Sequence, residues 1–373
     1  MRSSVFTFAV IALAMNAAHV GAAASATEFA QTAIYHSPQT PGYTAWCTLW
    51  RTRDGQLRVA FQQITGPVED WKKRRNVTVI LGSDDEAKSW KKLREVPART
   101  NAPSDGDKVY AAPGSAAFCG HGLAALPDGT LVTGLWATAQ EKSGYIQRST
   151  DDGANWSSPI YIVNPNEYKA YPNQIRRLHD GRLMLVAGTV RQTDAKTSRW
   201  LLKQFFESRD EGKTWSHVWT MPAETGLCEE SDIVELDSGD LLLVHRAEHY
   251  KEQNLLGSDR LQNVFRRNGD KWDVQPVEKA PFPHSGFPEL LKTRDGTILH
   301  IGTDGVWRSA DGGKHWSKVE LPGSPYYPRA TQLNDGRILV VGHVGGDDEY
   351  GKVDQSIVQQ TFRLTPVNDK PVQ

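Results

Sequence analysis

Apolar and polar residues along this chain follow a repeating pattern that predicts β-hairpins. Six times, an apolar run is followed by a turn with a glycine and by a second apolar run. The turn glycines are Gly55, Gly129, Gly181, Gly239, Gly296 and Gly336. Asp-Gly between apolar runs is a strong signal for a tight hairpin turn, and the intervals of roughly 40 to 74 residues suit four-stranded propeller blades.

The residues before each turn glycine divide into two faces of a predicted strand. Six residues before the glycine the position is apolar in every copy: Leu49, Leu123, Ile175, Ile233, Leu290 and Ala330. Because successive side chains of a strand point to opposite faces, we assign this parity to packing between blades and the other parity to a central channel. The channel set includes Trp46, Glu230, Asp232, Glu289, Tyr327 and Arg329, and on the following strands Gln62, Arg246 and His343.

A second repeat, S-x-D-x-G-x-x-W, interleaves with the hairpins. It occurs at 149–156, 208–215 and 309–316, and a fourth copy at 83–90 has Ala87 in the glycine position. Ser and Asp side chains bond nearby backbone amides, Gly supplies a positive φ and Trp packs beneath the turn, so we interpret the motif as structural and not catalytic. Repetition at this spacing indicates a circular all-β architecture.

The last predicted blade is one strand short. In the fourth blade Asn268-Gly269, followed by Trp272, takes the place of the signature turn, whereas the sixth has only a last strand near 356–364. We therefore expect the segment around Thr32 to Tyr35 to join that strand, because closing the ring removes exposed sheet edges. The sequence predicts an all-β, six-bladed β-propeller closed by an N-terminal strand.

The first residues predict an export signal. Arg2 supplies a positive start, residues 5–15 an apolar stretch and Ala24-Ser25-Ala26 a small-residue cleavage site. The apolar run is shorter than the roughly 20 residues of a membrane span. We expect a signal peptide at 1–26, a single propeller domain at 27–373 and a secreted or periplasmic protein without a membrane span.

The composition of the chain limits the kinds of binding partner that we expect. A net charge of -1 and a pI near 6.8 leave no basic footprint for nucleic acid. Of the three cysteines, Cys47, Cys119 and Cys228, at most one pair can form a bridge, and a Cys47 to Cys119 bridge on adjacent blades is conceivable. Their spacing is not that of a metal site. We expect no metal, no cofactor and a monomeric chain.

With these features in place, the chain resembles the exo-α-sialidase (neuraminidase) superfamily of Asp-box, or BNR-repeat, propellers over nearly all of the predicted mature chain. The segment from Glu230 to Arg246 is similar to the one that holds the family's catalytic Glu and, sixteen residues on, an Arg of its carboxylate clamp. Tyr327, nine residues before Gly336, matches the family's nucleophilic Tyr. The resemblance implies a retaining exo-glycosidase in which Glu230 deprotonates Tyr327, and the sialidase type is an exception to the rule of two carboxylates.

The resemblance also implies a general acid in a loop of the first blade. Asp70 is the first candidate for this acid and Glu69 the second. The family's three-arginine clamp is matched in register only by Arg246, since the first clamp position reads Ala45-Trp46-Cys47. Arg308 abuts an outer turn, and Arg329 is placed to compensate, one channel step beyond Tyr327.

The predicted partner is an extracellular glycan or glycoconjugate that ends in an acidic sugar. Predicted substrate-binding residues are Arg246, Arg329, Glu289, Asp232, His121, Trp46, Gln62 and His343. Two alternatives stay open. One is a paired-carboxylate glycosidase that uses Glu230 with Glu289 or Asp232; the other is a non-catalytic propeller that binds a glycan or a protein, because fold alone does not decide between catalysis and binding.

Overall fold

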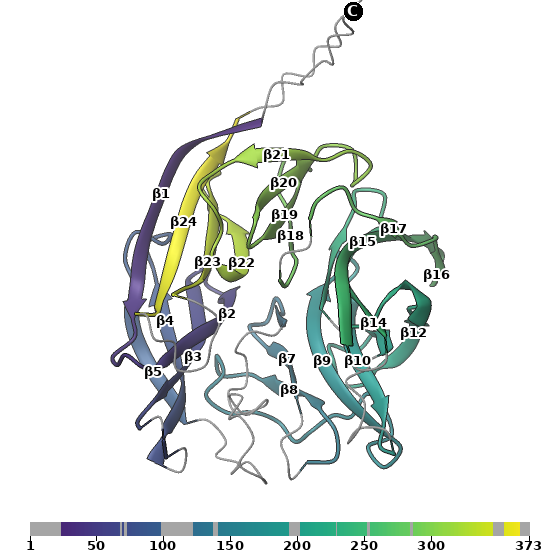
Figure 1. The fold of residues 1–373 in the computed structure, drawn as a ribbon, viewed down its shortest axis with the longest axis horizontal. Coiled ribbons are helices and arrows are strands. Elements are labelled where there is room, and N and C mark those ends of the chain that lie inside the picture. The colour runs from purple at the N-terminus through teal and green to yellow at the C-terminus, as the bar shows by residue number, and fades with distance from the viewer. Residues whose placement is uncertain are drawn as a thin grey trace, which may run out of the picture.

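The computed structural model describes residues 24–67, 69–70, 73–97, 122–136, 141–193, 202–228, 230–251, 254–283, 286–345 and 354–365. The regular secondary structure of these residues is β-strand, apart from a short 3-10 helix, η2, at Ala223–Thr225. Figure 1 shows the strands gathered into small sheets that form a ring. The structure confirms an all-β, six-bladed propeller.

Blades 1 to 3 follow one another along the chain. Blade 1 consists of β2 (Tyr43–Arg51), β3 (Leu57–Thr65), β4 (Arg75–Ser83) and β5 (Lys91–Pro97). Blade 2 consists of β6 (Leu123–Ala125), β7 (Leu131–Leu135) and β8 (Tyr145–Ser149). Blade 3 consists of β9 (Tyr168–Arg177), β10 (Leu183–Arg191), β11 (Leu202–Ser208) and β12 (Ser216–Thr220).

Blades 4 to 6 complete the ring. Blade 4 consists of β13 (Ser231–Glu235), β14 (Leu241–Lys251), β15 (Asn254–Asn268) and β16 (Lys271–Val274), with β17 (Glu278–Lys279) also on β15. Blade 5 consists of β18 (Glu289–Lys292), β19 (Ile298–Gly302), β20 (Gly305–Ser309) and β21 (Ser317–Glu320). Blade 6 consists of β22 (Tyr326–Gln332), β23 (Ile338–Val344), β24 (Ser356–Leu364) and the N-terminal β1 (Ala24–His36).

The N-terminal strand closes the ring as expected. β1, purple in Figure 1, runs antiparallel to β24, in yellow, with Thr32 opposite Gln359 and Tyr35 opposite Ile357. Its first residues also pair in parallel with β21. Residues 1–23 of the predicted signal segment lie outside the described residues, and the cleavage site stays a prediction. In the part of the chain that the structure describes, no helix is long and apolar enough to cross a membrane.

Hydrophobic side chains fill the seams between neighbouring blades. The positions six residues before the turn glycines all belong to these interblade clusters: Leu49 between blades 6 and 1, Leu123 between 1 and 2, Ile175 between 2 and 3, Ile233 between 3 and 4, Leu290 between 4 and 5, and Ala330 between 5 and 6. The assignment of this parity to the packing between blades is confirmed.

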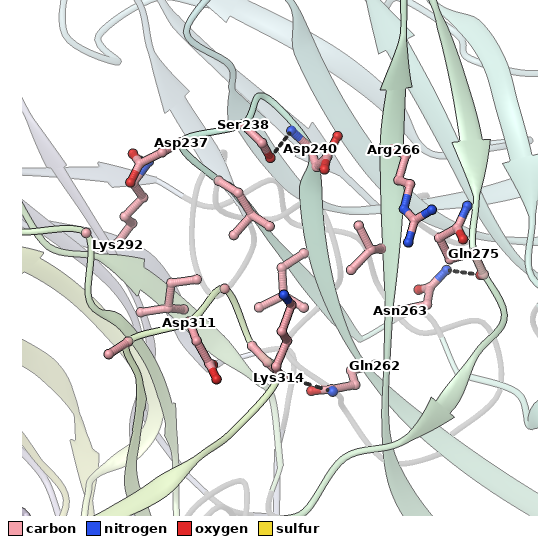
Figure 2. Close-up of a pocket in the computed structure, with 18 of the residues that line it drawn as sticks. Asp237, Ser238, Asp240, Gln262, Asn263, Arg266, Gln275, Lys292, Asp311 and Lys314 are labelled. Atoms are coloured by element: carbon pink, nitrogen blue, oxygen red, sulfur yellow. Dashed lines mark hydrogen bonds and ion pairs between the residues drawn. The ribbon is translucent and has the colours of Figure 1, made fainter. Parts of the chain in front are cut away.

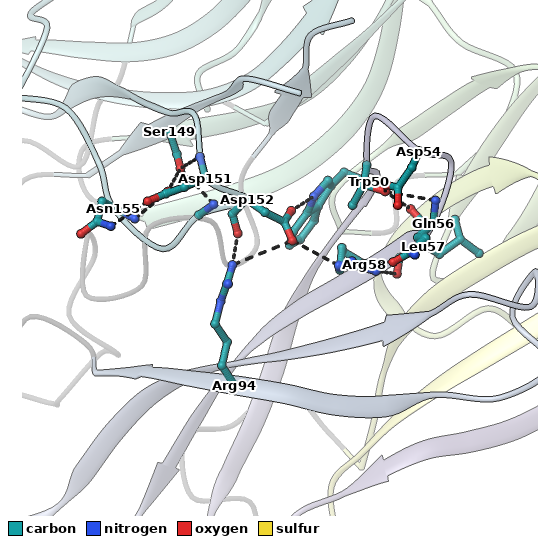
Figure 3. A network of polar contacts seen from close by, with 12 residues as sticks. Trp50, Asp54, Gln56, Leu57, Arg58, Arg94, Ser149, Asp151, Asp152 and Asn155 are labelled. Carbon is teal, nitrogen blue, oxygen red and sulfur yellow. Dashed lines mark hydrogen bonds and ion pairs between the residues drawn. The ribbon is translucent and has the colours of Figure 1, made fainter. Parts of the chain in front are cut away.

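The signature turns are held by their own side chains, as Figure 3 shows for blade 2. Ser149 Oγ donates to Asp151 Oδ1 (2.8 Å) and accepts from the Gly153 amide (2.9 Å), and Asp151 Oδ1 also accepts from the Asn155 amide (2.8 Å). These bonds from Asn155 and Ser149 lower the pKa of Asp151 to about 2. Ala87, which replaces glycine in the first copy, adopts the same left-handed backbone with φ of 64°.

The fourth residue of each signature turn faces the preceding blade. In blade 2 this residue is Asp152, whose carboxylate accepts from Trp50 Nε1 (3.1 Å) and Arg58 Nε (3.2 Å) of blade 1. Arg94, also of blade 1, donates to the Asp152 carbonyl (Figure 3). A carboxylate at the turn therefore fastens two blades together.

The fourth residue of the signature turn makes the same kind of link in blades 1 and 3, but not in blade 5. Glu86 of blade 1 accepts from the Asn334 amide of blade 6 (2.8 Å), and Glu211 of blade 3 lies 3.6 Å from Arg148 of blade 2. In blade 5 the position is Gly312, which has no side chain to offer blade 4.

A buried polar network joins the inner strands. It lies on the face of each strand opposite to the face that packs in the interblade clusters. Asp232 on β13, fully buried, accepts from Arg176 of β9 at 2.5 and 2.8 Å and from Gln174 at 2.9 Å. It also accepts from the Leu290 amide of β18 at 2.6 Å. One carboxylate thus connects blades 3, 4 and 5.

Glu289 continues the network into blade 6. Its carboxylate lies 3.1 Å from Arg176 and 3.3 Å from Arg329 of β22, and it accepts from the Ala330 amide at 3.1 Å. Burial raises the pKa of Glu289, against the opposing effect of Arg176. Buried carboxylates persist when they are paired and fully hydrogen-bonded, and both of these are.

We expect Asp232→Asn to destabilise the propeller by about 3 to 5 kcal/mol, because it removes the fully buried carboxylate that pairs with Arg176 and leaves Glu289 as the partner of that arginine. The matched control is Asp237→Asn. Asp237 also pairs with a cation, Lys292 at 2.6 Å, but its side chain is 84% exposed, and exposed pairs contribute roughly 0 to 1 kcal/mol. Equilibrium urea unfolding of both variants measures the difference; equal losses would contradict the structural role of the network.

Candidate active site

Two residues on the inner strands adopt a backbone that side chains normally avoid. Trp46 and Tyr327 have φ of 59° and 48°, each at a β-bulge where the pairing of the inner strand shifts register. Left-handed conformations of non-glycine residues cost of order 1 to 3 kcal/mol and cluster at functional sites. A bulge re-aims a side chain out of the regular pleat, so both rings are set by local backbone geometry.

The Tyr327 ring lies among other aromatic side chains at the entrance end of the inner strands. Its centroid is 6.1 Å from Trp46, 6.0 Å from His343 and 6.3 Å from Phe287. The Arg329 guanidinium carbon lies 4.4 Å from the Phe287 ring centroid, a cation-π distance. Four residues that the sequence assigned to the site, Tyr327, Trp46, His343 and Arg329, are therefore brought together by blades 1 and 6.

Glu230 and Arg246 form the charged part of the site on blade 4. Glu230 precedes β13 and is 7% exposed, and its Oε2 accepts from Arg246 Nη1 at 2.7 Å. The Arg246 amide donates to the Glu230 carbonyl at 2.9 Å, which fixes the two residues through the backbone as well. Burial acts to lower the pKa of Arg246, but the charge of Glu230 outweighs it and raises the pKa above its ordinary value.

The long β14 adds two residues that the sequence did not indicate. Arg246 Nη2 donates to Glu248 Oε1 (2.5 Å), and Glu248 Oε2 accepts from the Tyr250 hydroxyl (2.5 Å). Burial and this hydrogen bond raise the pKa of Tyr250 to about 12. Residues two apart on a strand share a face, so the run from 246 to 250 was the available signal.

Arg260 is a further residue that sequence reasoning missed. It lies opposite Arg246 on β15 and is 1% exposed. Its Nη2 donates to the Gly286 carbonyl (2.7 Å), whereas Nε and Nη1 have no hydrogen-bond partner among the residues that the structure describes. Burial lowers its pKa to about 10. Gly286 directly precedes Phe287, so this contact joins the charged group on blade 4 to the aromatic group around Tyr327.

Buried polar side chains hold the backbone around Glu230 and Arg246 in place. Ser231 Oγ lies 2.8 Å from the Glu230 carbonyl and 3.1 Å from His245 Nδ1, and His245 Nε2 lies 2.7 Å from Asn263 Oδ1. Lys203 of blade 3, also buried, donates to the Arg246 carbonyl at 2.8 Å. Burial, with Lys203 nearby, lowers the pKa of His245 well below its ordinary value, which favours the neutral ring.

The remaining predicted residues lie elsewhere. Asp70, in the loop between β3 and β4, pairs with Lys73 at 2.9 Å, and Gln62 donates to Asn76 at 3.0 Å. Asp232 and Glu289 belong to the buried network described above. Arg308 donates to the Thr365 carbonyl at the outer edge of the ring. His121 lies outside the described residues, as does Cys119, so the bridge from Cys47 to Cys119 stays a prediction; Cys47 and Cys228 are not bonded to each other.

The site thus combines a phenol held in a strained position with a carboxylate and a cationic group. Direct pairing of Tyr327 with Glu230, and delivery of a proton by Asp70, stay predictions. Among the described residues, no group of three or more His, Cys, Asp or Glu side chains is placed to hold a metal ion.

Comparison with known proteins relates the chain to one family. The profile of the family described as BNR repeat-like domain matches residues 30–301. No curated protein gives a significant sequence match.

Solved structures share the fold at low sequence identity. A protein of unknown function from Dyadobacter fermentans has a TM-score of 0.62 and 17% identity over 90% of this chain and 98% of its own. An α-L-arabinanase from Penicillium chrysogenum has a TM-score of 0.61 and 16% identity over 90% and 97%. The NanB sialidase of Streptococcus pneumoniae has a TM-score of 0.60 and 14% identity over 90% and 71%.

Acid should weaken the fold through His300. This side chain is fully buried and stacks on Phe282 at 4.0 Å, and in the described part of the chain neither ring nitrogen has a hydrogen-bond partner. Burial, followed by the charge of Arg260, lowers its pKa well below the ordinary value. In the unfolded chain this histidine is protonated near pH 6.5, whereas in the folded chain it stays unprotonated at that pH. The free energy of unfolding therefore falls by about 1.4 kcal/mol per pH unit as the pH drops below 6.5.

When the pH is lowered from 7 to 5.5, the free energy of unfolding should fall in both proteins. We expect the fall to be about 1 kcal/mol smaller for His300→Leu than for the wild type. Urea unfolding at the two pH values measures this difference. His217→Leu, at an exposed histidine of β12, is the control and should follow the wild type. A wild-type pH dependence in the His300 variant would show that this ring does not control acid stability.

Proposed function

Because the chain belongs to the BNR repeat-like domain family, we propose that it is a retaining exo-glycoside hydrolase that releases a terminal, acidic sugar from glycans. The observation that carries the proposal is the left-handed backbone of Tyr327, which sets a phenol among Trp46, Phe287 and His343 at the entrance of the ring. Strain at a residue with a nucleophilic group supports a catalytic role. We also propose that the chain is exported with its N-terminal segment removed.

In the proposed mechanism Tyr327 is the nucleophile. Glu230 takes the phenolic proton, since a tyrosine with its ordinary pKa near 10 needs a base at neutral pH. The phenolic oxygen bonds to the anomeric carbon while the bond to the leaving oxygen breaks, and Asp70 donates a proton to that oxygen. Water then attacks the anomeric carbon, gives its proton to Asp70 and releases Tyr327, which recovers its proton from Glu230.

The arginines support an acidic sugar as substrate. A carboxylate beside the anomeric carbon would repel an anionic nucleophile, whereas a neutral phenol avoids that repulsion. Arg246 pairs with Glu230 on blade 4, Arg329 packs on Phe287, and Arg260 keeps Nε and Nη1 without a hydrogen-bond partner among the described residues. Guanidinium groups are the preferred partners of carboxylates. Among the structural relatives, the Streptococcus pneumoniae protein is named a sialidase and the Penicillium chrysogenum protein an arabinanase.

A paired-carboxylate mechanism has less support. Asp232 and Glu289 are 0% and 1% exposed, and both carboxylates are engaged by arginines and backbone amides that connect the blades. Using either of them on a sugar would expose charges that the inner strands need for packing. Glu230 keeps the catalytic assignment, with Tyr327 as its partner.

Tyr327→Phe and Glu230→Gln should each lower hydrolysis of the best substrate by about a thousandfold or more, because nucleophile and base act as one unit. The measurement is initial-rate fluorescence with a panel of 4-methylumbelliferyl sialosides, uronides and neutral glycosides. Tyr326→Phe is the matched control: Tyr326 is the adjacent phenol, is 40% exposed and should retain turnover. Hydrolysis that survives both site variants would sink the assigned mechanism, and a panel without any turnover would leave glycan-array binding as the activity to measure.

Arg260→Met tests the preference for an acidic sugar. Removal of the buried cation should raise KM for acidic glycosides by about tenfold, the worth of one charge-assisted interaction, and leave neutral glycosides unchanged. The methionine side chain has a similar length, so thermal unfolding should show a folded protein that is as stable as the wild type or more so. Equal effects on acidic and neutral substrates would argue for a purely structural Arg260.

A further inference from the structure

The β14–β15 hairpin of blade 4 extends beyond the inner strand of that blade. β14 pairs with β13 only through residues 241–245, whereas its pairing with β15 continues to Lys251. Residues 246–251 and 254–260 therefore form a two-stranded ribbon, which we call the ribbon and which carries Arg246 of the candidate active site. Because two strands alone are at most marginally stable, the positions of the ribbon's side chains depend on the contacts that they make.

The other half of β15 is anchored beside a cavity of about 760 Å³ between blades 4 and 5 (Figure 2). Gln262 donates to the Gly313 carbonyl at 3.1 Å and accepts from Trp316 Nε1 at 3.1 Å. Asn263 donates to the Gln275 carbonyl at 3.2 Å, a bond that Figure 2 also shows. The ribbon therefore starts from a fixed part of blade 4.

The segment that carries Glu230 lies along the edge of the ribbon. Leu227 and Glu248 exchange two backbone hydrogen bonds, of 3.0 and 2.8 Å. The Arg246 amide donates to the Glu230 carbonyl at 2.9 Å. Between these bonds Cys228 has φ of 121°, which interrupts regular strand geometry. The ribbon thus fixes the backbone of Glu230, but the alternation of a regular strand does not set the direction of its side chain.

The side chains of the ribbon supply the missing constraint. Residues 246, 248 and 250 share a face, and they form a continuous chain of hydrogen bonds with Glu230. Arg246 donates from Nη1 to Glu230 Oε2 at 2.7 Å and from Nη2 to Glu248 Oε1 at 2.5 Å. Glu248 Oε2 accepts from the Tyr250 hydroxyl at 2.5 Å. Two carboxylates therefore fix the plane of one guanidinium, and both oxygens of Glu248 are used.

We propose that Glu248 and Tyr250 are positioning residues for the base Glu230, an inference that rests on the proposed hydrolase function. Both act through Arg246, which holds Glu230 Oε2 and leaves Oε1 to take the phenolic proton of Tyr327. A base has to lie within hydrogen-bond reach of the proton that it takes. A displacement of about 1 Å costs on the order of a hundredfold in rate, so the orientation of this carboxylate decides turnover.

Glu248 also shares the positive charge of Arg246 with Glu230. A guanidinium paired with Glu230 alone would exert its full attraction on that carboxylate and favour the ionised form more strongly. A second carboxylate on the same guanidinium weakens this attraction. Other ionisable groups near the two arginines of the site are Arg260, Cys228 and Asp304, all of them unchanged in the variants below.

Steady-state kinetics with the 4-methylumbelliferyl glycoside that the wild type hydrolyses best tests the proposal. Glu248→Gln keeps the size of the side chain and removes its charge, so kcat should fall about tenfold with KM within about twofold of the wild type. The acid limb of the pH profile of kcat/KM should move to lower pH, because Glu230 then feels the full charge of Arg246. A purely structural role would not move that limb.

Tyr250→Phe removes the last bond of the chain and should lower kcat about threefold, again with KM unchanged. Since Tyr250 acts through Glu248, adding Tyr250→Phe to Glu248→Gln should cause no further loss. If Glu248→Gln does not fold, Tyr250→Phe decides the question through the same two constants.

Asp259→Asn is the matched control on the same ribbon. Asp259 pairs with Lys279 at 2.8 Å and with His249 at 3.0 Å. It lies opposite Ala247, so its side chain is on the other face of the ribbon from Arg246. The control should keep the kcat and the pH profile of the wild type, and thermal unfolding shows that each variant is folded.

A double-mutant cycle in urea tests the shared arginine without any turnover. Glu230→Gln and Glu248→Gln each leave Arg246 with one carboxylate, whereas the combined variant leaves it with none. The loss of unfolding free energy in the combined variant should therefore exceed the sum of the two single losses.

Three results would overturn the proposal: full kcat in a folded Glu248→Gln variant, a raised KM with unchanged kcat, or additive losses in the urea cycle. The second result would make Glu248 a substrate-binding residue. A wild type that hydrolyses no glycoside of the panel would overturn the proposed hydrolase and, with it, the reaction that Glu248 and Tyr250 serve. Each of the three results with an active wild type counts against the positioning role alone.

Discussion

The inner strands keep their relative positions because two buried carboxylates hold them together. Asp232 and Glu289 draw Arg176, Arg329 and three backbone amides from four blades into one network of short contacts. A carboxylate so far from water is tolerated only when all of its acceptor sites are used. Donors from the neighbouring blades bond the two carboxylates. The same bonds hold in position the blades that carry Glu230 and Tyr327.

The candidate site is assembled on top of this rigid base from residues that depart from regular strand geometry. Trp46 and Tyr327 sit at bulges with left-handed backbones, and β14 continues past its partner β13 to present Glu248 and Tyr250 beside Arg246. Local strain is sustained where the surrounding structure determines the conformation. On blade 4, the buried Ser231, His245 and Asn263, with Lys203 from blade 3, hold the backbone of Glu230 and Arg246 in place.

The outer end of the blades uses a different device, repeated at three of the six seams. A turn closed by its own Ser and Asp needs no help from the rest of the protein, so its fourth position is available to meet the preceding blade. Where that position has a carboxylate, the seam is fastened; where it is Gly312, a cavity lies between the two blades. The architecture therefore tolerates the loss of one link because the hydrophobic cluster between blades 4 and 5 still holds the seam.

The sequence by itself determined the number of blades, the parity of the inner strands and the closure by β1, because these follow from local signals: glycine at turns, alternation within strands and self-contained signature turns. It also placed Tyr327, Trp46, His343 and Arg329 on one face, and the structure brings them together. The sequence did not assign Asp232 and Glu289 to the interblade network, and it did not indicate Arg260. A polar residue occupies the same alternating position along a strand whether its side chain contacts a ligand or an arginine of another blade. Which charges find partners, and which stay unpaired, depends on contacts between segments tens of residues apart, and only the closed ring creates those contacts.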